Sequence, residues 1–189
     1  MSDTWSWTEK MKFPNKNYAN RGMAFEQLIT MANQVYRQKG IAAVIKIPTS
    51  WKVLWKNYGG YRKPINAFPE SKAFLDYVGA IDGDAVTFDT KETNNKTSFP
   101  LSNVKEHQMR DMRNWCKCGG FAFLLVWWKE RNEVYLLPYE VLLKAWNEAK
   151  KGGRKSISYK QFQTDAIEVH SGNGVYFDYL TAYKTYRGV

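Results

Sequence analysis

The segment from Phe74 to Glu92 constrains the fold of this chain more than any other. Two strand-like stretches, Phe74–Ile81 and Val86–Glu92, flank the sequence Asp82-Gly83-Asp84-Ala85. Asp-Gly between apolar stretches is a strong signal for a tight turn joining antiparallel strands. The sequence therefore predicts a β-hairpin here.

The parity of this hairpin decides which side chains share a face. A turn centred on Gly83-Asp84 places Asp76 opposite Lys91, and a turn centred on Asp82-Gly83 places Asp76 opposite Asp89. Because strand residues alternate between faces, either turn puts all three side chains on one face. A three-residue loop or a bulge would break that parity. The other face carries the residues expected in a core, which are Tyr77, Ile81, Val86 and Phe88.

The remaining patterns predict an α/β domain with a central mixed sheet flanked by helices. A β-branched run at Ile41–Ile47 is interpreted as a buried strand. Asn103, with Glu106 three residues later, favours a helix N-cap at Asn103. Helices are predicted from Phe25 to about Lys39, up to about Lys117 and over Tyr139–Lys150, strands over Phe121–Trp128 and Glu133–Leu137, and short elements near Phe162 and Tyr176.

The domain organisation follows from the breaks in these patterns. Residues 1–18 have no clear period and are expected to form a flexible arm, while residues 19–189 form one domain. Residues 48–70 show neither a helical nor a strand period, which favours a long inserted loop. We expect neither a membrane span nor a secretory signal. The two cysteines, Cys116 and Cys118, lie too close together for an ordinary structural disulfide and favour a reducing cytoplasm.

The charge of the chain favours a polyanionic partner. Lys and Arg number 28 against 18 Asp and Glu, a formal net charge of +10. On net charge alone, a merely basic protein fits equally well. The distribution is more specific, because no acidic residue occurs between Glu26 and Glu70. Nucleic acid is therefore the favoured partner.

The carboxylates of Asp76 and Asp89 predict a metal site. Two carboxylates on one strand face repel each other, and a hard divalent cation such as Mg²⁺ relieves that repulsion while it keeps water ligands. Lys91 on the same face would position an attacking water or neutralise charge on a phosphate. The alternative is an ordinary exposed strand face with Asp89 and Lys91 solvated. The metal interpretation predicts a phosphodiester hydrolase.

The inserted segment alternates aromatic and cationic residues. Aromatic faces can stack on unpaired bases while cations follow the phosphates. Alternatively, the aromatic side chains pack back on the body of the protein. Gly59-Gly60 suits the tip of a projection. The residues concerned are Trp51, Trp55, Tyr58 and Tyr61 with Lys52, Lys56, Arg62 and Lys63.

Several blocks of this sequence resemble a known family. A carboxylate followed by a strand turn and a (D/E)-x-K pattern is similar to the PD-(D/E)xK nuclease superfamily, and more narrowly the chain resembles the RecU family of Holliday junction resolvases. Five blocks, in family order, carry this resemblance: Asn20-Arg21-Gly22-Met23-Ala24-Phe25-Glu26, Asp76-Tyr77-Val78-Gly79, Phe88-Asp89-Thr90-Lys91-Glu92-Thr93, Lys96-Thr97-Ser98-Phe99-Pro100-Leu101 and His107-Gln108.

The resemblance implies a fold, an activity and a partner. It implies a restriction-endonuclease-like domain with a projecting stalk at residues 48–70, and a homodimer that nicks two opposed strands of a four-way DNA junction with Mg²⁺ or Mn²⁺. Asp76, Asp89 and the Thr90 carbonyl would bind the metal and Lys91 would be catalytic, with Glu26 in or just behind the site. Two positions depart from the family pattern, since glutamate is common at Asp89 and a small hydroxyl residue at Leu75.

Further residues are expected to contact DNA. Arg21 could reach a phosphate or pair with Glu26, and Thr97 and Ser98 could donate to phosphate oxygens or cap the following helix. Lys46, Gln108 and the stalk cations Lys52, Lys56, Arg62 and Lys63 complete the set. The sequence has no Gly-rich phosphate loop, so no nucleotide cofactor is expected. A sequence-specific restriction-like nuclease and a non-catalytic junction-binding architectural protein remain as alternatives.

Overall fold

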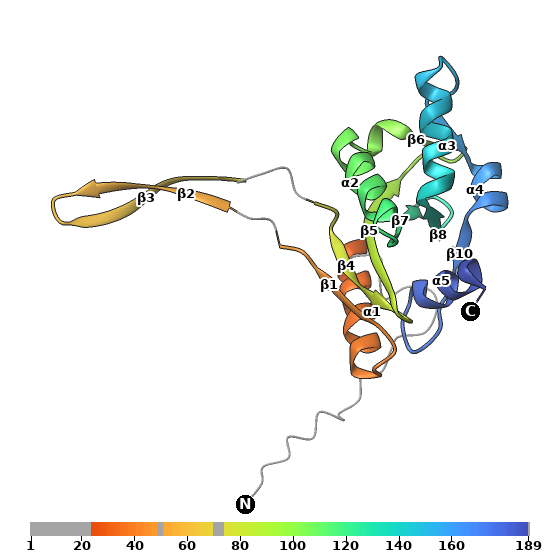
Figure 1. Ribbon diagram of the computed structural model, residues 1–189, viewed down its shortest axis with the longest axis horizontal. Helices are drawn as coiled ribbons and strands as arrows, with labels where there is room; N and C mark the ends of the chain where they lie inside the picture. The colour runs from red at the N-terminus through yellow and green to blue at the C-terminus, as the bar shows by residue number, and fades with distance from the viewer. Residues whose placement is uncertain (1–23, 49–50, 70–73, 189) are drawn as a thin grey trace, which may run out of the picture.

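The computed structural model describes residues 24–48, 51–69 and 74–188. Its centre is a six-stranded mixed sheet in the order β1-β4-β5-β7-β8-β10 (Figure 1). Neighbouring strands are antiparallel except β5 and β7, which are parallel. The strands are β1 (Ala43–Lys46), β4 (Tyr77–Ile81), β5 (Asp84–Thr93), β7 (Phe121–Trp128), β8 (Glu133–Pro138) and β10 (Ile167–Val169).

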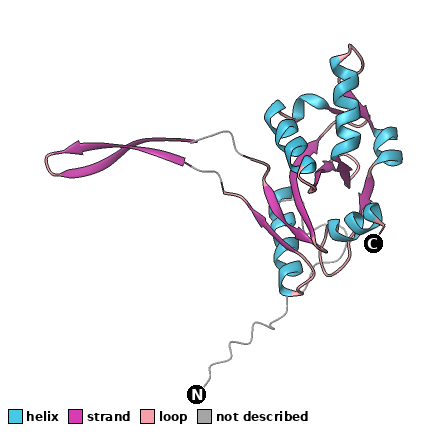
Figure 2. Cartoon of the chain, viewed as in Figure 1, coloured by secondary structure: helices cyan, strands magenta, loops and turns pink. Residues whose placement is uncertain are grey.

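Helices cover both faces of this sheet, so the predicted mixed α/β fold is confirmed (Figure 2). On one face, α1 (Phe25–Gln38) and α5 (Tyr179–Arg187) pack against the sheet in one apolar cluster. On the other face, α2 (Glu106–Lys117), α3 (Tyr139–Lys150) and α4 (Tyr159–Asp165) form a second cluster. Strand β7 separates the two clusters, because alternate side chains along it enter one or the other.

The β4–β5 hairpin has the second of the two predicted registers. Tyr77 pairs with Phe88 and Ile81 pairs with Asp84, so the turn is centred on Asp82-Gly83. Both turn residues have positive φ, 49° at Asp82 and 89° at Gly83, as a type I′ hairpin turn requires. Continued by one residue, this register places Asp76 opposite Asp89. The predicted core face is confirmed as well, since its four residues are fully buried.

The inserted segment is a β-hairpin, not the long loop that its lack of period indicated. Strands β2 (Trp51–Tyr58) and β3 (Tyr61–Pro69) pair with each other alone and project away from the body (Figure 1). A register shift between Leu54 and Trp55 marks a bulge. Both faces of β2 are exposed, so no burial pattern selects apolar residues at every second position. Gly59 and Gly60 form the tip, as expected.

Several smaller predictions need correction. β1 is an edge strand in which only Val44 is buried, because α1 covers one face and no strand lies beyond it in the sheet. Asn103 is not an N-cap; it ends a 3₁₀ turn, η1 (Leu101–Asn103), and α2 begins at Glu106. The tail contains α4 at the predicted position near Phe162, whereas Tyr176 lies in a bend that precedes α5. It also contains β10 and β9 (Ser156–Ser158), which pairs with β6 (Ser98–Pro100).

The predicted arm, residues 1–18, lies outside the described residues. Among the helices of the described part of the chain, none is long and apolar enough to cross a membrane.

Candidate active site

Asp89 is the centre of the candidate site. It lies in the middle of β5 on the face opposite Phe88, and only 1% of its surface is exposed. Its Oδ2 atom accepts hydrogen bonds from Lys91 Nζ at 2.8 Å and from Gln108 Nε2. Its Oδ1 atom is buried and has no hydrogen-bond partner among the described residues. A buried carboxylate oxygen without a donor is costly, which makes this atom a good ligand for a cation.

Asp76 brings the second carboxyl group to the same place. It directly precedes β4, and its backbone carbonyl accepts a hydrogen bond from the Ile47 amide at 2.7 Å. Burial, followed by hydrogen bonding and charge from Asp89, raises the pKa of Asp76 to about 7, against the opposing charges of Lys91 and Lys46. Two carboxyl groups that disfavour joint ionisation in this way are suited to sharing a divalent cation.

Gln108 connects helix α2 to the carboxylates. The residue is buried, and its Oε1 atom accepts a hydrogen bond from the backbone N–H of Lys105 at 3.0 Å, as in a capping box. Its Nε2 atom donates to Asp89. Both ends of the amide are therefore engaged within the protein. The start of α2 thus holds the orientation of one oxygen of Asp89.

A second polar group borders the site at the start of α1. Lys46 on β1 forms an ion pair with the Glu26 carboxylate. The Tyr77 hydroxyl donates to the Glu26 carbonyl at 3.1 Å and lies 3.3 Å from the Thr30 hydroxyl. The hydrogen bond and the charge of Glu26, with a smaller contribution from Asp76, raise the pKa of Lys46. Sequence reasoning did not identify Tyr77 as support for Glu26, because strand alternation indicated only a core position.

The structure brings most of the predicted catalytic and metal-binding residues into two neighbouring groups. Asp76, Asp89, Lys91 and Gln108 form the carboxylate cluster, and Glu26 and Lys46 form the bordering pair. Thr90 lies on β5 between Asp89 and Lys91, and the role of its carbonyl stays a prediction. Among the described residues, no group of three or more His, Cys, Asp or Glu side chains is arranged to hold a metal. A cation here would therefore need backbone or water ligands in addition.

The other predicted DNA-contact residues that the structure describes lie outside the carboxylate cluster. Thr97 is exposed, and Ser98 pairs with Ser158 between β6 and β9. Arg21 lies outside the described residues. The four stalk cations are exposed, and three stack on aromatic rings: Lys56 lies 5.5 Å from the Tyr58 ring, Arg62 lies 6.0 Å from the Trp55 ring and Lys63 lies 5.3 Å from the Tyr61 ring.

Leu75 explains how the chain accommodates one departure from the family pattern. Its side chain is fully buried and packs in the cluster of residues under α2 and α3. It therefore acts as a core residue that anchors the backbone next to Asp76. A small hydroxyl at this position would leave a cavity of several methyl groups in that core.

Comparisons with known proteins identify similar sequences over most of the chain. The family described as Recombination protein U (RecU) matches residues 20–185. A relative from Oenococcus oeni, named Holliday junction resolvase RecU, is 35% identical over 180 residues, which are 94% of this chain and 91% of the relative. A Staphylococcus aureus (strain JH9) relative with the same name is 34% identical over 172 residues, 90% of this chain and 83% of the relative.

One solved structure is also similar. The structure of Hjc, a Holliday junction resolvase from Archaeoglobus fulgidus, matches with a TM-score of 0.43 and 10% identity, over 82% of this chain and 96% of that chain. At that level of similarity, the description of the fold rests on the strands and helices of this chain itself.

Proposed function

This chain belongs to the RecU family, and on that premise we propose that it is a structure-selective, metal-dependent DNA endonuclease that resolves Holliday junctions by paired symmetric nicks during recombination and repair. The observation that carries the proposal is the pair of carboxyl groups at Asp76 and Asp89, with the buried Oδ1 of Asp89 lacking a donor. The two cysteines are free thiols, as expected in a reducing cytoplasm, where we place this activity.

The donor set fits a hard divalent cation. Asp76, Asp89 and the Thr90 carbonyl would hold Mg²⁺ or Mn²⁺, because carboxylate and carbonyl oxygens are the ligands such ions prefer. When bound, the cation supplies Lewis acidity to a phosphodiester oxygen and lowers the pKa of a coordinated water.

The protein side chains provide positioning and charge. Lys91, held 2.8 Å from Asp89 Oδ2, neutralises the negative charge that builds on the scissile phosphate or orients the attacking water. Gln108 holds Asp89 in place, and we assign it this role because its amide is already engaged by Asp89 and Lys105. Glu26, paired with Lys46, lies at the edge and orients that lysine toward the DNA backbone.

The proposed substrate surface combines the stalk with the rim of the site. On the stalk, Lys52, Lys56, Arg62 and Lys63 follow phosphates while the exposed aromatic residues stack on the unpaired bases of the branch point. Arg21, Lys46, Thr97 and Ser98 contact the arms near the scissile phosphate. A homodimer supplies two such sites, as nicking of two opposed strands requires.

Labelled mobile four-way junctions and matched linear duplexes, incubated with and without Mg²⁺, test this proposal. We expect junctions to be cut at opposed positions with Mg²⁺ and duplexes to remain intact. Equal cutting of both substrates contradicts the resolvase assignment and favours a restriction-like nuclease.

A matched pair of variants tests the rival architectural role. Asp89→Ala and Lys91→Ala should abolish Mg²⁺-dependent cutting while junction binding persists. A wild-type protein that binds junctions and never cuts them under any divalent cation would support a non-catalytic junction-binding protein.

A further inference from the structure

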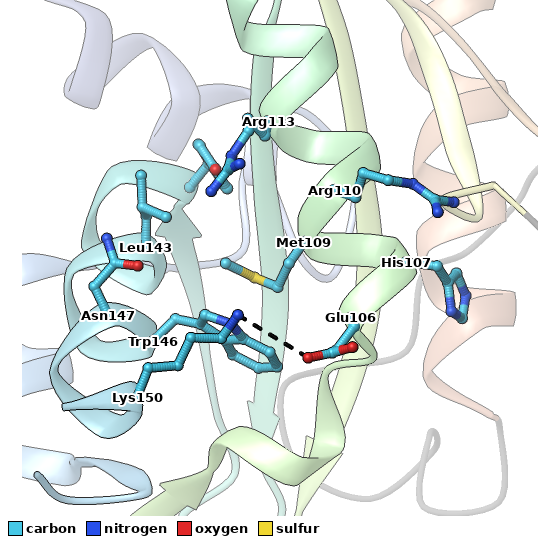
Figure 3. Close-up of a pocket in the computed structure, with 10 residues that line it drawn as sticks. Glu106, His107, Met109, Arg110, Arg113, Leu143, Trp146, Asn147 and Lys150 are labelled. Carbon is cyan, nitrogen blue, oxygen red and sulfur yellow. Dashed lines mark ion pairs between the residues drawn. The ribbon is translucent and has the colours of Figure 1, made fainter. Parts of the chain in front are cut away.

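A pocket lies between helices α2 and α3 on the outer side of the domain. Its volume is about 330 Å³. In Figure 3, Met109 and Arg113 point from α2 toward α3, whereas His107 and Arg110 point away to the other side of α2. From α3, the pocket is lined by Tyr139, Leu143, Trp146, Asn147 and Lys150. None of these residues belongs to the proposed catalytic cluster or to the stalk.

The floor of the pocket is apolar. Met109 is buried, and Leu143 and Trp146 are half-buried side chains that pack against the core cluster under α2 and α3. A concave apolar floor of this size accommodates one large aliphatic or aromatic side chain.

A buried hydroxyl group adds a polar contact to this floor. Tyr139 lines the pocket with only 4% of its surface exposed, and its hydroxyl has no hydrogen-bond partner among the described residues. A buried phenol without a hydrogen-bond partner is unfavourable. A ligand that brings an acceptor oxygen into the pocket would satisfy it.

The rim of the pocket is mainly cationic. Arg113 is exposed and has no ion pair within the described residues, and Lys150 lies 6.0 Å from the centre of the Trp146 ring. Lys150 also contacts Glu106 at 4.0 Å across one end of the pocket (Figure 3). Both partners of that pair are largely exposed, so the pair is weak and the carboxylate of a ligand can replace Glu106.

We propose that this pocket binds an acidic peptide segment of another protein, with one apolar side chain on the floor and its carboxylates on the cationic rim. The charge complementarity of Arg113 and Lys150 selects carboxylates, and the hydroxyl of Tyr139 donates to an acceptor of the peptide. DNA fits less well, because its phosphates would leave the apolar floor uncovered. The site would bring the nuclease to a partner without occupying its catalytic face.

Fluorescence anisotropy tests this proposal with a labelled peptide of five aspartates followed by Gly-Leu-Phe. The full-length protein should bind it, and Arg113→Glu should weaken binding at least about tenfold. Tyr139→Phe should weaken binding about three- to tenfold by removing the donor. The matched control is Lys144→Glu, an exposed residue of α3 outside the pocket with the same charge change, and it should stay within about twofold of wild type.

Two altered peptides separate pocket binding from general charge attraction. Replacement of Leu-Phe by Ser-Ser, or of the aspartates by asparagines, should each lower the affinity at least about tenfold. Equal binding of the Ser-Ser peptide, equal effects of Arg113→Glu and Lys144→Glu, or no binding by wild type would each overturn the proposal.

Two further measurements distinguish other occupants. Arg113→Glu should cut and bind junctions as wild type does, because Arg113 is outside the proposed catalytic machinery. Loss of junction binding in this variant would assign the pocket to DNA, and a change in its oligomeric state would assign it to a second copy of this chain. Either result would overturn the peptide proposal, and neither depends on whether wild type resolves junctions.

Discussion

At the scale of single residues, the two oxygens of Asp89 are in different environments. Oδ2 accepts from Lys91 and Gln108, whereas Oδ1 is buried without a donor. The neighbouring Asp76 has a pKa raised to about 7 by burial and by Asp89. In the absence of a cation, a proton on Asp76 relieves the repulsion between the two carboxyl groups. The cation of the proposed function and this proton would be alternatives at Asp76.

The raised pKa of Asp76 makes the stability of the metal-free protein dependent on pH. The folded-state pKa of Asp76, about 7, exceeds the ordinary value of 3.8, so the folded protein holds a proton that the unfolded chain releases between these values. Stability is therefore lost as pH rises from about 4 to about 7. Asp76→Asn should be more stable than wild type by about 1–2 kcal/mol at pH 8, and the difference should disappear near pH 4.

Urea denaturation in EDTA at several pH values measures this difference. The exposed Asp165→Asn on α4 serves as the matched control and should show no such trend. A difference between Asp76→Asn and wild type that stays constant with pH would contradict the proposed proton site.

Gln108 gives a second residue-scale prediction. If it positions Asp89, Gln108→Ala should lower Mn²⁺ affinity and the cleavage rate about 10- to 100-fold, because residues that orient metal ligands have effects of that size. Junction affinity in Ca²⁺ should stay within about twofold. Titration calorimetry and anisotropy measure the two quantities, with Gln163→Ala on α4 as control. Weaker junction binding with unchanged Mn²⁺ affinity would contradict this role and would indicate that Gln108 contacts DNA, as the sequence analysis predicted.

At the scale of elements, the stalk is energetically separate from the domain. The hairpin β2–β3 pairs only with itself, and its large apolar residues are exposed, Trp51 at 57% and Trp55 at 52%. An isolated two-stranded hairpin has marginal stability in water. Binding that orders its aromatic side chains against bases would therefore stabilise the hairpin together with the complex.

Replacement of Trp51–Pro69 by a short Gly-Ser linker tests this separation. We expect the melting temperature of the body to change by less than about 2 °C, because few apolar contacts are lost. Junction affinity should fall at least about 100-fold as phosphate and stacking contacts disappear. Calorimetry and anisotropy measure the two effects, with Asn57→Ala on the intact hairpin as control. A large drop in melting temperature would show that the stalk packs on the body.

Some features of these elements could be predicted from the sequence, and others could not. The Asp-Gly turn and strand alternation narrowed the β4–β5 hairpin to two registers that share one face, and the structure has one of them. The stalk strands and the exposed edge of β1 could not be predicted, because no burial pattern marks them. The hydrogen bond from Gln108 to Asp89 could not be predicted either, because it depends on where α2 lies relative to β5 in space.

At the scale of the whole molecule, the chain has a formal net charge of +10, whereas its proposed site contains two carboxyl groups. In the proposed function, positive charge on the stalk and around the catalytic site would hold the polyanion, and the carboxylates are concentrated where a cation could neutralise them. One such site cuts one strand. Two chains of 22.0 kDa must therefore act together if both opposed strands of a junction are to be nicked.

Mixed dimers test this requirement directly. Wild-type and Lys91→Ala chains with different affinity tags are coexpressed, and heterodimers are isolated by two successive purifications. Lys91 is suited to this, because 18% of its side chain is exposed and its loss leaves the carboxylates in place. The heterodimer should convert each junction to a singly nicked junction, whereas the wild-type dimer should release two linear duplexes and the Lys91→Ala dimer neither. If chains act independently, the heterodimer preparation will instead yield linear duplexes at a reduced rate, since a second active chain can bind the nicked junction and complete the reaction.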